Sequence, residues 1–162
     1  MIANPQIFKV YHVFHHHWDI ECIYELLQLN KMKLVGFIKE YNQIKEAISL
    51  TELVSDNSEL YTNSEKVINY LNNGVLLLGW MGYFIDVKSK KLIAPDSYHT
   101  DGIWVWPSYY TYYLEMYPFI KINPEFLAHM EGRNFEMNVD ANFDNRKIKK
   151  EEELSLKLST KS

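Results

Sequence analysis

Cysteine is almost absent from this chain of 162 residues, which contains only Cys22. A single thiol cannot form an intrachain disulfide, and zinc sites built from several cysteines are excluded. Cys22 lies beside Ile20 and Ile23 in a stretch with helical spacing. We therefore expect it to be a small buried side chain rather than a nucleophile.

The chain also lacks an excess of positive charge, with 17 Lys and Arg against 21 Asp and Glu and a formal net charge of -4. General nucleic-acid binders need cations to neutralise phosphates, so that class is disfavoured. No Lys or Arg occurs between Lys91 and Lys121, although this stretch is rich in aromatic residues. A stacking platform for single-stranded nucleic acid would need a basic groove there. Mild acidity remains compatible with a basic protein partner.

Apolar runs long enough to span a membrane are missing as well. The longest apolar stretch, residues 75–85, contains two glycines and is too short to span a bilayer. The first residues do not combine a basic segment with an apolar run, so we expect no signal peptide. We expect a cytoplasmic protein that does not bind membranes.

What is present is enough for a packed core, because 47% of the residues are hydrophobic and 15% are aromatic. The residue patterns predict an α+β fold, a single domain over residues 1–137 with a mostly antiparallel sheet and several short helices. Residues 138–162 are polar and charged, and we expect a frayed C-terminal tail. Its alternating leucines leave an edge strand as the other possibility: Leu154, Leu156 and Leu158.

Residue spacing predicts the order of the elements. Strands are expected at residues 7–14, 33–38 and 103–106, and the apolar run gives either two strands, 75–80 and 81–87, or one strand broken at a glycine. Helices are expected at residues 19–29, from about 41 to 53, from Ser64 to just before Gly74, at 107–117 and from Asn123 to Gly132. In the last helix, Asn123 is the expected cap and Pro124 the first residue.

Two histidine groups are candidates for chemistry. His15, His16 and His17, with His12 nearby, could bind a metal, but the sequence places no clear third ligand, and a polar strand end is the competing interpretation. His99 lies in a predicted loop with Asp96 and Asp101, a combination that could perform acid–base chemistry. Short loops are rich in Asp for turn reasons alone, and no standard catalytic motif occurs.

Aromatic and acidic residues are the candidates for partner binding. Tyr and Trp are favoured anchors in protein interfaces, and the segment around the tryptophans has more rings than one core requires. An acidic patch near the N-terminus would steer a basic partner. The residues that we expect to contact a partner are Asp19, Glu21, Glu25, Trp104, Trp106, Tyr109 and Tyr112.

One arrangement of motifs supports a family resemblance. It consists of Tyr70-Leu71-Asn72-Asn73-Gly74, then Thr100-Asp101-Gly102-Ile103-Trp104-Val105-Trp106-Pro107, then Tyr112-Tyr113, then Asn123-Pro124-Glu125-Phe126-Leu127-Ala128-His129-Met130. Over about residues 64 to 135, it resembles small bacterial proteins, some of which look like immunity proteins encoded beside polymorphic or contact-dependent toxins.

The resemblance implies a non-enzymatic protein without a cofactor that binds one cognate toxin domain and blocks it stoichiometrically. A nuclease toxin would suit an acidic blocker, since its substrate cleft is expected to be basic. Two alternatives remain at the level of the sequence. One is a small enzyme using His99 with Asp96 or Asp101, and the other is a metal-binding or sensory module using His15–His17.

Overall fold

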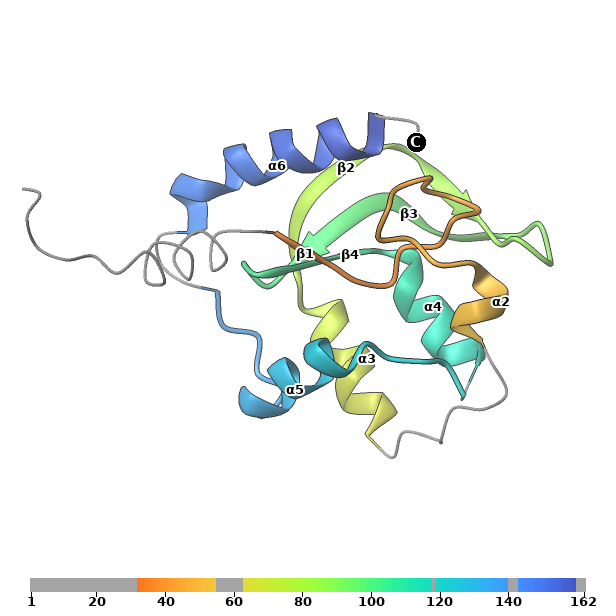
Figure 1. Ribbon diagram of the computed structural model, residues 1–162, viewed down its shortest axis with the longest axis horizontal. Coiled ribbons are helices and arrows are strands. Elements are labelled where there is room, and N and C mark those ends of the chain that lie inside the picture. The colour runs from red at the N-terminus through yellow and green to blue at the C-terminus, as the bar shows by residue number, and fades with distance from the viewer. Residues whose placement is uncertain (1–31, 55–62, 118, 140–142, 160–162) are drawn as a thin grey trace, which may run out of the picture. The chain divides into compact units, whose positions relative to one another are not determined.

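A computed structural model of the chain describes residues 32–54, 63–117, 119–139 and 143–159 (Figure 1). These residues belong to one compact unit that begins at Met32. The strand expected at residues 7–14 and the helix expected at residues 19–29 lie outside the described residues. Those expectations, and the inclusion of residues 1–31 in the same domain, stay predictions.

A four-stranded sheet with the order β1-β4-β3-β2 forms the centre of the described residues. β1 (Lys33–Leu34) runs parallel to β4 (Trp104–Pro107). β3 (Leu92–Thr100) is antiparallel both to β4 and to β2 (Val75–Ile85). The predicted α+β class with a mostly antiparallel sheet is therefore confirmed. The apolar run forms the single interrupted strand β2 at one edge of this sheet.

Helices flank the sheet on two sides. Figure 1 shows α6 lying along β2, while α3, α4 and α5 gather beyond the opposite side of the strands. The helices of the described residues are α2 (Leu50–Leu53), α3 (Ser64–Asn72), α4 (Tyr109–Met116), α5 (Pro124–Gly132) and α6 (Phe143–Ser159).

The start of α5 confirms its prediction. Asn123 Oδ1 accepts hydrogen bonds from the backbone N–H groups of Glu125 at 2.9 Å and Phe126 at 3.1 Å. These two N–H groups have no partner inside the helix, so the cap satisfies them. Pro124 occupies the first helical turn, where a missing N–H costs nothing.

The prediction of a helix from about residue 41 to 53 was wrong over most of its length. Only α2 is helical there, and Ser49 caps it by accepting a hydrogen bond from Glu52 N at 3.1 Å. The preceding segment instead forms an isolated parallel bridge between Ile38 and Ile48. Tyr41 is drawn into contacts with distant rings, so tertiary packing overrides the helical spacing.

Pro107 also differs from its prediction as the first residue of a helix. It is the last residue of β4, is paired with Tyr98 of β3, and α4 begins two residues later at Tyr109. Proline is tolerated at a strand end because it removes only a donor from the ladder.

The prediction of a frayed tail was wrong for residues 143–159, which form α6. Leu154 is completely buried and Phe143 nearly so, which anchors the helix against the rest of the unit. Lys157 adds an ion pair with Glu46 at 3.0 Å. The leucines at 154 and 158 lie four residues apart, so they share a helix face and their alternation does not mark a strand.

Candidate interaction surface

The carboxylate of Asp101 is the most heavily hydrogen-bonded group in the motif that carries the resemblance. Its Oδ1 accepts from the backbone N–H groups of Ile103 at 2.8 Å and Trp104 at 2.7 Å. Its Oδ2 accepts from the Tyr70 hydroxyl at 2.7 Å and lies 2.8 Å from His129 Nε2. Burial and the adjacent carboxylate raise the pKa of the Tyr70 phenol well above its usual value. Asp101 therefore joins the β3–β4 turn to α3 and α5.

The turn next to Asp101 needs its glycine. Gly102 has φ +95°, a conformation that residues with a Cβ rarely adopt. Thr100 Oγ1 accepts from Gly102 N at 3.0 Å and donates to Trp104 O at 2.6 Å. The Thr-Asp-Gly sequence is thus explained by the construction of the turn.

The tryptophans and Tyr109 are core residues. Trp104, Trp106 and Tyr109 expose at most 4% of their surface. Phe126 contacts both tryptophan rings, with centroids 5.1 Å and 5.8 Å away. The prediction that these three residues contact a partner was therefore wrong, because neighbouring side chains cover them. Strand β4 is buried on both faces, which alternation alone did not indicate.

The other predicted contact residues have different outcomes. Tyr112 is half-buried on α4, so its role stays a prediction. The acidic patch of Asp19, Glu21 and Glu25 lies outside the described residues, as do Cys22 and the histidines His12 and His15–His17. Within the described residues, no group of three His, Cys, Asp or Glu side chains could hold a metal ion.

His99 and Asp101, which were predicted to act together with Asp96, have different hydrogen-bond partners in the structure. Asp101 bonds Tyr70 and His129, whereas His99 Nδ1 lies 3.2 Å from Gly74 O and His99 Nε2 lies 3.3 Å from Ser97 Oγ. Asp96 is half-buried, and this burial raises the pKa of its carboxyl. Ser97 and His99 line a hollow of about 330 Å³, together with Asn72, Ser108, Thr111, Tyr112 and Glu115 among others.

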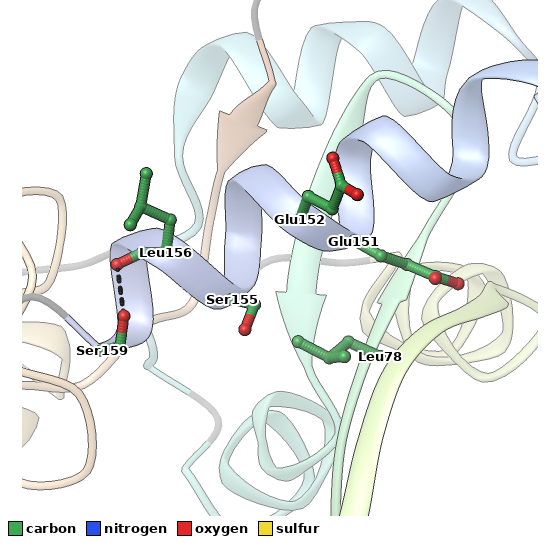
Figure 2. A pocket seen from close by; sticks show the side chains of 6 residues that line it. All are labelled: Leu78, Glu151, Glu152, Ser155, Leu156 and Ser159. Atoms are coloured by element: carbon green, nitrogen blue, oxygen red, sulfur yellow. Dashed lines mark hydrogen bonds between the residues drawn. The ribbon is translucent and has the colours of Figure 1, made fainter.

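A second hollow lies between α6 and β2. Figure 2 shows Leu78 of β2 facing α6, with Ser155 directed toward it and Glu152 directed away. Glu151 and Lys147 lie one turn apart on α6, and their charged atoms are 3.9 Å apart. This ion pair lies at the surface, where such pairs contribute little to stability.

The outer part of the β2–β3 hairpin carries large exposed apolar side chains. We call five of them the hairpin surface: Trp80, Met81, Tyr83, Ile85 and Leu92, which expose 47%, 104%, 62%, 49% and 67% of their area. β2 carries no charged residue along its eleven positions. Large apolar side chains exposed close together along one hairpin are typical of interaction sites, whereas widely scattered single residues are not. The signal in the sequence was an apolar run interrupted by two glycines, but its exposure depends on β2 lying at the sheet edge.

Comparisons with known proteins add no identification. No protein-family model matches the chain, and no curated protein or solved structure does so either. None of the helices in the described ranges is long and apolar enough to cross a membrane.

Proposed function

We propose that this chain is an immunity protein that neutralises one cognate toxin domain by binding it stoichiometrically. The observation that carries the proposal is the hairpin surface, which offers Trp, Met and Tyr side chains to a partner. These residue types are enriched at protein interfaces, and a few of them can supply most of the binding energy. Turnover is not needed for this activity.

The architecture of the motif indicates which residues are taken up by the fold rather than by binding. Asp101, Tyr70 and His129 hold elements together through short hydrogen bonds, and the tryptophans fill the core. The motif thus serves the fold. A function in binding would then depend on surfaces outside the motif, as expected for proteins that share a fold and bind different partners.

The test begins with the gene immediately upstream of the one for this chain. Its C-terminal domain should be expressed alone and then together with this chain, and cell survival measured. We expect death without the chain, survival with it, and a 1:1 complex in size-exclusion chromatography with light scattering. Titration should reach full protection at equimolar protein, because occlusion without turnover cannot act at lower ratios. Continued killing despite excess folded chain would refute the proposal.

A hydrolytic enzyme is the second candidate, and one contact favours it. If His99 Nδ1 donates to Gly74 O, its Nε2 is free to accept a proton from Ser97 Oγ. A serine paired with an oriented imidazole is the arrangement of an activated nucleophile. A fluorophosphonate probe should then label the wild type and spare Ser97→Ala. Absence of labelling at all concentrations would remove this candidate.

A further inference from the structure

Part of the hairpin surface extends across two strands on one face of the sheet. Tyr83 is paired with Pro95, and Ile85 with Leu92. Directly opposite residues of an antiparallel pair share one face of the sheet. All four of these residues are exposed, so the outer half of the hairpin presents an apolar face about two residues wide.

Strand addition at the edge of β2 is a poor explanation for this face. The register passes from Gly79–Ser97 to Tyr83–Pro95, so three residues of β2 stand opposite the single residue Asp96 of β3. A bulge of this kind interrupts the regular ladder and protects an edge from pairing with another strand. Met81, which lies in the bulge, is fully exposed. Side chains rather than backbone groups are therefore the contact-making part of the hairpin.

The exposed charge at the hairpin turn is positive. Lys88, Lys90 and Lys91 are exposed within four positions, although the whole chain has a net charge of -4. The carboxylate of the same turn, Asp86, is buried and accepts hydrogen bonds from Ser89 N at 2.6 Å and the Tyr113 hydroxyl at 2.9 Å. Its charge is thus directed inward, while the ammonium groups remain at the surface.

The lysines are also held near the turn. Lys90 Nζ donates to Val87 O at 2.7 Å, and Lys88 Nζ lies 4.8 Å from the centre of the Tyr117 ring. The nearest carboxyl on β3, Asp96, is half-buried beside the bulge. The hairpin therefore combines an apolar strip with a basic end.

We propose that the hairpin surface is the element that contacts the toxin, an inference that rests on the proposed function. The hairpin docks on an apolar pocket of the toxin that is bordered by carboxylates. Charge complementarity favours a pocket bordered by carboxylates over the basic substrate cleft of a nuclease, because that cleft would repel the three lysines. If the toxin is a nuclease, the hairpin binds outside its substrate cleft.

The experiment measures binding of the full chain to a catalytically inactive variant of the upstream-encoded toxin domain by surface plasmon resonance. Met81→Asp should raise Kd by about 30-fold or more, mainly through faster dissociation, because it replaces a fully exposed apolar side chain of the hairpin surface by a charged one. The triple variant K88E/K90E/K91E should slow association by about tenfold at low salt. That difference should largely disappear at about 1 M NaCl, where the screening length is short.

Matched control variants separate the hairpin from general surface effects. Ile148→Asp places the same charge at an apolar residue of α6 that is 68% exposed. The charge control is the triple variant K66E/K121E/K149E, which reverses the charge of three exposed lysines on other segments. Both controls should bind within about twofold of the wild type, because exposed substitutions away from an interface have little effect. Circular dichroism must show that all variants are folded.

The outcomes distinguish the two proposals. Wild-type binding that hairpin variants leave unchanged would overturn the docking site and preserve the immunity function. A wild-type chain that does not bind the toxin would overturn both. Co-sedimentation of the wild type and the hairpin variants with phosphatidylglycerol vesicles tests whether the hairpin binds an anionic membrane instead of the toxin. Loss of vesicle binding in the hairpin variants, with toxin binding intact, would assign the hairpin to an anionic membrane and overturn its assignment to the toxin.

Discussion

Replacing Gly36 by Ala should strongly destabilise the fold. Gly36 has φ +72°, and an added Cβ would lie only 2.4 Å from Cγ of Tyr110. Tyr110 is completely buried, so its ring cannot move into solvent. An alanine in the left-handed region costs about 1–2 kcal/mol, and forced overpacking costs about 1–3 kcal/mol more. We therefore expect the free energy of unfolding to fall by about 2–5 kcal/mol, a large share of the stability of a typical domain.

Gly132→Ala is the matched control for this prediction. Gly132 is the last residue of α5, and an added Cβ would meet no atom within 4 Å. Because alanine favours helix more than glycine does, this substitution should stabilise by up to about 1 kcal/mol. Urea unfolding followed by tryptophan fluorescence measures both variants. Equal stability of Gly36→Ala and the wild type would refute the close approach of Tyr110.

Four further predictions use the same unfolding assay. The Tyr110 hydroxyl is buried without a hydrogen-bond partner among the described residues, so Tyr110→Phe should be neutral or stabilising by up to about 1 kcal/mol. Tyr109→Phe, which loses hydrogen bonds to backbone and side chain, should destabilise by about 1–2 kcal/mol. Burial raises the pKa of Tyr98 from 10.0 to about 12, so the unfolded chain ionises first and stability should fall as the pH rises between these values. This fall should be shallower in Tyr98→Phe, and an unchanged slope would contradict it. Leu154→Ala should cost about 2–5 kcal/mol, whereas the exposed Ile148→Ala should change stability by less than about 0.5 kcal/mol; equal effects would show that α6 is not packed through Leu154.

Local sequence signals predicted those parts of the fold whose physics is local. Asn123 and Pro124 identify the start of α5 because the cap needs only neighbouring N–H groups. Asp101 and Gly102 identify the β3–β4 turn for the same reason. These predictions require no knowledge of the remaining chain.

Other parts of the fold depend on contacts between distant residues. Tyr41 fits a helical face by spacing, but its hydroxyl lies 2.7 Å from that of Tyr113, 72 positions away. Its segment also bridges Ile38 and Ile48 in a way that no helix permits. Spacing alone cannot distinguish the two outcomes, because both bury the same side chains.

The candidate site was predicted least well, for a related reason. Trp104 and Trp106 have the residue type of an interface anchor, yet β4 lies between two other strands and is covered on both faces. Trp80 and Met81 also belong to an apolar run, but β2 lies at the edge of the described sheet and leaves them exposed. Strand order decides which aromatic residues are exposed, and strand order is not encoded in any local pattern.

The location of the motif determines what the resemblance can support. Asp101 comes from a turn, Tyr70 from α3 and His129 from α5, and each meets the others only when the fold is complete. Replacing one of them would disturb the packing before it affected any binding surface. The hairpin surface contains none of the motif residues. Proteins that share this motif should therefore share the fold, and under the proposed function a different hairpin would give each of them a different partner.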